Sequence, residues 1–309
     1  AAKAEEAGAE VLVRQDDKLR GKGYALEHAF QHEKTAGADA VVVIDADTLV
    51  SANLLEAFAA RLEAGARAVQ ADYAVRDAMG SWRTRLMAIA FGAFHIVRSR
   101  SRERFGVSCG LRGNGMCFSR ALLAEVPHRA FSLVEDVEFG LRIGQAGHRV
   151  EYAGEAHVWG EMVATEQASR SQRQRWEGGR FLMARTFGPG LLVEAVRERS
   201  LLLLDLACDI VVPPLGQIVA LDVLVLAVAL AVRVRTGAGQ GALTLAAASL
   251  AALFLYVLRG WSLSGTGARG LLDLTLAPLY LAWKLTLRLR RRGNARGDWV
   301  RTRRQGEPS

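Results

Sequence analysis

The most informative segment of this 309-residue chain is Val41-Val42-Val43-Ile44-Asp45-Ala46-Asp47. Four consecutive β-branched apolar residues are typical of a buried strand in a sheet that helices cover on both faces. The strand runs directly into two carboxylates, those of Asp45 and Asp47. Ligands of open α/β sheets bind beyond the carboxyl ends of the strands, so we expect a functional site at this point.

Strand and helix patterns alternate on both sides of this segment. Apolar residues at helical spacing precede it at 25–30 and follow it at 54–62. Further strands are predicted at 11–13 and 68–71. This order predicts an α/β domain with a mainly parallel sheet over residues 1–199.

The two aspartates form a DxD pattern whose hard carboxylate oxygens suit Mg²⁺ or Mn²⁺. Such an ion commonly binds through one or two carboxylates plus substrate phosphates. The pattern by itself is weak, since a chain of this length contains about one by chance, and capping of the following helix is the alternative. Lys22, in the glycine-rich segment 19–23, is a candidate phosphate ligand, although a plain turn is equally consistent.

A second acidic pair, Glu135-Asp136, precedes another helical pattern. Ser132 and Glu135 have the spacing of a capping box, which would explain Glu135 by helix stability alone. That box does not explain Asp136, which we therefore consider a candidate catalytic residue. The nearby segment 110–115 is rich in glycine, but its glycines are not spaced as in a dinucleotide-binding fingerprint.

A third polar group lies in the predicted helix that contains Gln172-Arg173-Gln174-Arg175-Trp176. Spacings of three and four place Gln172, Arg175 and Trp176 on one helical face. An amide and a guanidinium can hold a diphosphate by forked hydrogen bonds, and an indole can stack on a sugar ring. The alternative is an interfacial helix with Trp and Arg at the lipid headgroups.

The chain changes character near residue 200. Residues 236–258 contain no Asp, Glu, Lys or Arg, and about 20 mainly apolar residues can span a bilayer. We predict spans at 213–232 and 240–258, then an interfacial helix at 271–287 that carries several polar residues. Residues 200–287 are therefore a predicted membrane region.

The net charge is concentrated in the predicted tail, residues 288–309. The chain has 40 Lys and Arg against 32 Asp and Glu, a formal charge of +8, and 50% hydrophobic residues exclude a disordered polyelectrolyte. Eight arginines lie at 288–304 against only Asp298. This bias predicts a multi-pass protein of the cell (inner) membrane whose tail and α/β domain are cytoplasmic, with membrane lipids and no nucleic acid as partners.

With Asp45-Ala46-Asp47, Glu135-Asp136 and the 172–176 group in this order before apolar helices, the chain resembles the membrane-bound family 2 glycosyltransferases. Within that family the chain resembles cellulose, hyaluronan and poly-N-acetylglucosamine synthase-like enzymes. The resemblance implies a GT-A fold and metal-dependent, inverting transfer of a sugar from a nucleotide diphosphate, expected to be UDP, to a growing polysaccharide. Single transfer to a glycolipid acceptor and a non-catalytic membrane scaffold are the alternatives. The family's first nucleotide-binding strand is expected to precede residue 1.

The resemblance also implies roles for single residues. Asp136 would be the general base that takes the proton of the acceptor hydroxyl. Asp47 and Asp45 would bind the divalent metal, Mg²⁺ or Mn²⁺. The nucleotide-sugar donor would contact four side chains, those of Lys22, Asp45, Gln172 and Arg175. The acceptor would contact Trp176 and Glu135.

Overall fold

The computed structural model describes residues 2–161 and 166–279, apart from the side chains of 33–36 and 166–177. The arginine-rich tail and the end of the predicted interfacial helix lie outside the described residues.

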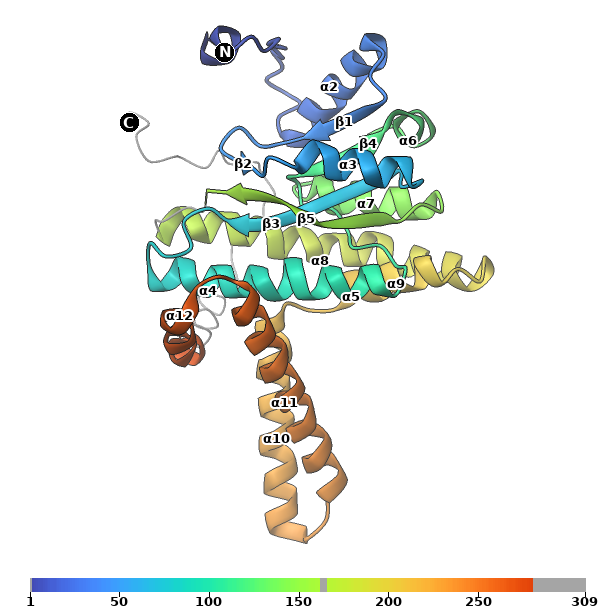
Figure 1. The fold of residues 1–309 in the computed structure, drawn as a ribbon. Helices are drawn as coiled ribbons and strands as arrows, with labels where there is room; N and C mark the ends of the chain where they lie inside the picture. The colour runs from blue at the N-terminus through green and yellow to red at the C-terminus, as the bar shows by residue number, and fades with distance from the viewer. Residues whose placement is uncertain (1, 162–165, 280–309) are drawn as a thin grey trace.

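A five-stranded sheet in the order β1-β4-β3-β5-β2 forms the centre of the N-terminal part of the chain (Figure 1). Its strands are β1 (Ala40–Val43), β2 (Leu49–Val50), β3 (Ala68–Val75), β4 (Met116–Ser119) and β5 (Val150–Gly160). The strands predicted at 41–44 and 68–71 are β1 and the start of β3. Both confirm the pattern of short β-rich runs between helices.

The sheet is mixed, so the prediction of a mainly parallel sheet is wrong although the α/β class is confirmed. Within the described residues only β3 and β5 pair in parallel, and the other three pairings are antiparallel. The reason is the long connection after β3, which brings β4 back between β1 and β3 in the opposite direction. Hydrophobic periodicity reports that a strand exists and carries no information about its direction.

The predicted strand at 11–13 has no regular structure. Val13 is 68% exposed, and no strand of the described sheet pairs with this segment. A three-residue apolar run without a partner strand leaves its backbone groups to water, so it stays a loop.

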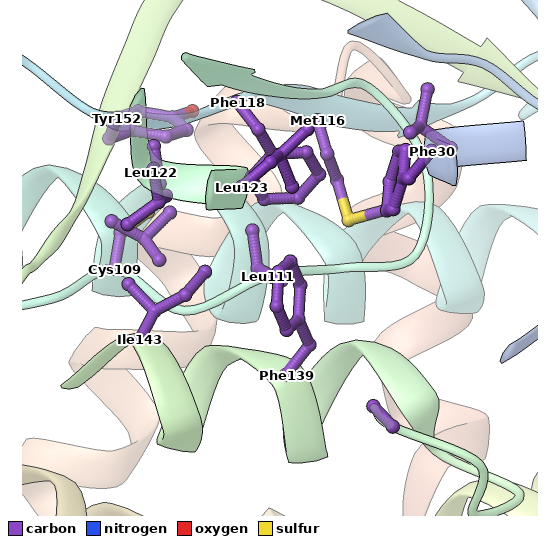
Figure 2. Packing of buried hydrophobic residues seen from close by; sticks show 14 residues of the cluster. Phe30, Cys109, Leu111, Met116, Phe118, Leu122, Leu123, Phe139, Ile143 and Tyr152 are labelled. Atoms are coloured by element: carbon purple, nitrogen blue, oxygen red, sulfur yellow. The ribbon is translucent and has the colours of Figure 1, made fainter. Parts of the chain in front are cut away.

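Helices cover both faces of the sheet. Helix α3 (Leu54–Glu63) packs one face through Leu54 and Phe58. The other face is covered by α2 (Lys22–Ala36), α6 (Arg120–Glu125) and α7 (Glu135–Gln145). There Phe30, Leu122 and Phe139 surround Phe118 of β4 (Figure 2). Burial of each such side chain contributes about 1.5 to 3 kcal/mol, so this cluster holds α2 and α7 against the sheet.

A further layer of helices lies on the outer side of α7. Buried apolar residues of α8 (Glu166–Arg197) and α9 (Leu201–Val211) pack against it. Helices α4 (Trp82–Phe91), η1 (a π-helix, Gly92–Val97) and α5 (Arg98–Arg104) follow one another as one rod (Figure 1). Ion pairs of Arg98 with Asp209 and of Arg102 with Asp205 join α5 to α9.

Helices α10 (Leu215–Thr236) and α11 (Gln240–Leu263) form a hairpin that projects from this layer (Figure 1). Both are long and apolar enough to cross a membrane, and only 6% of the most apolar window of each is buried. They coincide with the two predicted spans. Helix α12 (Gly267–Asp273) and the 3₁₀ helix η2 (Leu274–Leu276) form the described start of the predicted interfacial helix.

The hairpin meets the rest of the molecule at a close backbone crossing between η1 and α11. A Cβ atom at Gly260 would lie 2.7 Å from the Cβ of Ala93, and one at Gly92 would overlap the carbonyl oxygen of Gly260. The Tyr256 hydroxyl donates a hydrogen bond to the Ala93 carbonyl at 2.8 Å. The two glycines therefore allow the approach that fixes the base of the hairpin.

Candidate active site

The turn after β1 and the loop before β4 lie side by side because these two strands are antiparallel neighbours. Val43 pairs with Met116, and the Gly115 amide donates to the Val43 carbonyl at 3.0 Å. The Asp45 amide then donates to Oδ1 of Asn114 at 3.1 Å. The sheet register thus places the Asp45-Ala46-Asp47 turn against loop 110–115.

Lys22, the first residue of α2, reaches the same place. Its ammonium donates to the Asp45 carboxylate and to the Gly113 carbonyl. The side chains of Lys22 and Asp45 are 32% and 37% exposed, so both remain open to a ligand. The structure therefore brings together two of the predicted site residues that are distant in the sequence.

The first turn of α7 presents its carboxylates to this loop. Gly113 has a left-handed φ of 78°, and a Cβ atom there would lie 3.4 Å from Oδ2 of Asp136. Asp136 therefore lies on one side of Gly113, while Lys22 bonds to the carbonyl of the same glycine. Glu135 is adjacent in the same turn.

The capping box expected from Ser132 and Glu135 is absent. Helix α7 begins at Glu135 after Val134 with no side-chain cap, and the Ser132 hydroxyl is buried without a hydrogen-bond partner. The Glu138 carboxylate instead accepts the amides of Phe131 and Ser132 at 3.1 and 3.0 Å. A capping box therefore does not account for Glu135, although its place in the first turn of α7 still suits the helix dipole.

The electrostatics of the acidic pair follow from burial. Burial raises the pKa of Glu135, and repulsion from Asp136 raises it further. Burial also raises the pKa of Asp136, against the opposing effects of the Val137 amide, Lys22 and Arg112. A carboxylate with a raised pKa is a stronger base at neutral pH than an ordinary exposed aspartate.

Tyr73 is a site residue that the sequence patterns do not mark. Burial raises its pKa to about 12, the charges of Asp45, Asp47 and Asp136 add to the shift, and a hydrogen bond with Asn114 opposes it. Its hydroxyl therefore lies within the field of all three aspartates. A single tyrosine in a β-strand has no motif, so only the fold could identify it.

The carboxylates at this site suit a metal ion that is bound partly by the protein and partly by a substrate phosphate, rather than by protein side chains alone. Among the described residues no group of three or more His, Cys, Asp or Glu side chains forms a ready metal cage. Asp45 and Asp47 supply two carboxylates on one short turn, and Mg²⁺ usually binds through one or two carboxylates plus substrate phosphates. These residues thus suit an ion that binds together with a phosphate group.

The third predicted group stays a prediction. Residues 172–176 belong to α8, so the expected helix is confirmed. The side chains of Gln172, Arg175 and Trp176 lie outside the described residues.

Comparison with known proteins gives one family. The family model described as glycosyltransferase like family 2 matches residues 1–179, which include every residue of the site described above. No curated protein matches the chain.

Proposed function

The chain belongs to glycosyltransferase family 2 and is a glycosyltransferase; from this we propose that it transfers a sugar, with inversion, from a UDP-linked sugar donor to a growing polysaccharide, releases UDP, and requires Mg²⁺ or Mn²⁺. The observation that carries the proposal is the convergence of Lys22, Asp45 and Asp136 around Gly113. A cation for phosphates and a half-buried base then lie at the same glycine of one loop.

In the proposed reaction an acceptor hydroxyl attacks the anomeric carbon of the donor sugar from the face opposite the nucleotide. Asp136 takes the proton of that hydroxyl as the new glycosidic bond forms and the bond to the diphosphate breaks. A positioned carboxylate typically contributes about 10²- to 10⁴-fold to such a step. Burial of Asp136 supports this role, because it raises the pKa of the carboxyl.

Charge on the departing diphosphate is met by cationic groups. The Lys22 ammonium lies beside the Asp45 carboxylate, where a phosphate could share it. A Mg²⁺ or Mn²⁺ ion held by Asp45 and Asp47 would supply further electrostatic stabilisation of the leaving group. We assign Gln172 and Arg175 to the same diphosphate, and Trp176 and Glu135 to the acceptor.

The apolar hairpin supports the proposed location. Helices α10 and α11 would enter and leave the bilayer on the same side, so the α/β domain and the basic tail would both be cytoplasmic at the cell membrane. Membrane lipids, rather than nucleic acid, would be the partners of the tail. The hairpin also favours a lipid-linked acceptor as the second candidate, because an inserted hairpin would hold the catalytic domain at the bilayer surface.

The test is sugar transfer by membranes that contain the intact protein, supplied with labelled nucleotide sugars. We expect Asp136→Asn to lower transfer by at least about 10²-fold, with metal-dependent UDP binding retained, because the base is lost and the donor site is not. Asp17→Asn, a 98% exposed aspartate, is the control. Turnover like that of the wild type in Asp136→Asn would contradict the assignment, and the length of the product separates polymerisation from single transfer.

A further inference from the structure

We propose that Asn114 is a positioning residue that holds the Asp45-Ala46-Asp47 turn in the shape required for metal and nucleotide binding. The inference rests on the proposed function. It assigns to Asn114 no contact with the substrate and no proton transfer.

The side chain of Asn114 bonds to both ends of the acidic turn. Its Oδ1 accepts the Asp45 amide at 3.1 Å, and its Nδ2 donates to Oγ1 of Thr48 at 2.7 Å. The turn also closes on itself, because the Thr48 amide donates to the Asp45 carbonyl at 3.1 Å. One amide group thus bonds to the backbone of Asp45 and to the side chain of Thr48, on the two sides of Asp47.

The backbone of Asn114 is itself held by the buried side-chain amide of Gln70, on β3. Gln70 is 1% exposed, and its Nε2 donates to the carbonyls of Asn114, Ala71 and Gly115 at 2.8, 2.9 and 3.2 Å. Its Oε1 accepts the Arg112 amide at 2.8 Å. Loop 112–115 is therefore anchored to the sheet by both ends of one glutamine side chain.

The burial of Asn114 makes this clamp effective. The residue is 1% exposed, so water cannot readily replace either bond when the side chain is removed. Its backbone is flanked by Gly113 and Gly115, both at left-handed φ. A Cβ atom at Gly115 would lie 2.7 Å from Cγ2 of Val158, so the loop lies directly on β5.

The chemistry of the amide suits the position. An aspartate of similar size would keep an acceptor for the Asp45 amide but would lose the donor to Thr48 and add a negative charge beside the carboxylates. Groups that orient metal ligands typically change metal affinity by about 10- to 100-fold when they are removed. Asn114 is therefore expected to act on affinity through the shape of the turn.

The experiment compares two asparagine variants of the full chain in detergent. Asn114→Ala removes the clamp, and Asn53→Ala removes a bond of Asn53 to the Glu155 carbonyl at 2.9 Å that has no part in the turn. The first measurement is binding of UDP in the presence and absence of Mn²⁺. We expect Asn114→Ala to weaken Mn²⁺-dependent UDP binding by about tenfold or more, and Asn53→Ala to stay within about twofold of the wild type.

The second measurement needs no ligand. Hydrogen exchange of residues 44–48 should become faster in Asn114→Ala and stay unchanged in Asn53→Ala, because the Asp45 amide loses its acceptor. Wild-type exchange together with wild-type Mn²⁺-dependent affinity in a folded Asn114→Ala protein would overturn the proposal. A further outcome is that the wild type shows no Mn²⁺-dependent UDP binding while exchange at residues 44–48 still becomes faster in Asn114→Ala. That result would contradict the proposed function and would still support the role of Asn114 in holding the turn.

A milder variant covers the case in which Asn114→Ala does not fold. Thr48→Val keeps the buried amide and removes only the hydroxyl that accepts its Nδ2 at 2.7 Å. We expect faster exchange at 44–48 and a smaller loss of Mn²⁺-dependent affinity than in Asn114→Ala. A folded Thr48→Val protein with neither change would contradict the clamp.

Discussion

At the scale of single residues, Gly113 is the point around which the site is built. It has no side chain, so the Asp136 carboxylate can approach it from one side while the Lys22 ammonium bonds to its carbonyl. Its φ of 78° is one that other residues adopt at a cost. Gly113 thus lies between the Lys22 ammonium and the Asp136 carboxylate, and the positive charge of Lys22 opposes the rise that burial causes in the pKa of Asp136.

The raised pKa of Glu135 predicts how stability depends on pH. A carboxyl whose pKa is higher in the folded than in the unfolded state binds protons more tightly when folded, so the free energy of unfolding falls as pH rises above its ordinary value of 4.5. We expect Glu135→Gln to be more stable than the wild type at neutral pH, with the difference shrinking toward pH 4.5. Thermal unfolding of the ligand-free protein in detergent measures this.

The control for this prediction is Glu63→Gln, at an exposed position at the end of α3. Its stability relative to the wild type should not change with pH in the same way. A pH-independent difference between Glu135→Gln and the wild type would show that burial and Asp136 do not raise the pKa of Glu135.

At the scale of elements, the rod of α4, η1 and α5 connects the sheet domain to the hairpin. Its α5 segment is tied to α9 by two arginine–aspartate pairs, and its η1 segment carries the crossing with α11. The ring of His95, in η1, lies 5.5 Å from the ring of Tyr73 in the site. The base of the hairpin and the site are therefore separated by one layer of packed side chains.

Gly260→Leu tests the crossing. The added side chain would meet the backbone of Ala93 within 3 Å, and overpacking of this kind typically costs about 1 to 3 kcal/mol. We expect a lower unfolding temperature in detergent and a loss of transfer activity. Gly241→Leu, in the same helix, is the matched control because a Cβ atom there meets nothing within 4 Å. Equal unfolding temperatures for the two variants would refute the close crossing.

At the scale of the whole molecule, a helix-covered sheet domain is joined to a narrow apolar stalk formed by α10 and α11 (Figure 1). Many leucines and valines of α10 and α11 are exposed, in contrast to the buried ones between α7, α8 and α9. Such surface is unfavourable in water and is accommodated by lipid. The architecture thus favours a catalytic domain held at a bilayer.

Leu224→Arg tests insertion of the stalk. Leu224 is 59% exposed near the middle of α10, and an arginine at the centre of a spanning helix costs about 3 kcal/mol. We expect less of this variant than of the wild type to remain in membranes after an alkaline carbonate wash. Leu55→Arg, at a 67% exposed position on α3, should be retained like the wild type. Equal retention of both variants would argue against α10 as a span.

Local pattern is sufficient for much of this molecule. Apolar period and composition mark β1, β3, α2 and α3, because each is a short segment with apolar residues toward the core. The two long helices are marked instead by the length of their apolar runs. The acidic turn at 45–47 and the pair at 135–136 are visible for the same reason, since each follows or begins a regular element. Three-residue runs such as 11–13 are too short for this argument to hold.

Other features depend on which distant segments meet. The direction of β4, the place of Tyr73, and the bonds of Gln70 and Asn114 all arise from contacts between residues that are far apart in the chain. The loop at 110–115 looks unremarkable as a string of glycines, yet antiparallel pairing of β4 with β1 sets it against the acidic turn. A periodic pattern is a property of one segment, whereas a site of this kind is a property of how segments pack, so its geometry emerges only when the chain is folded.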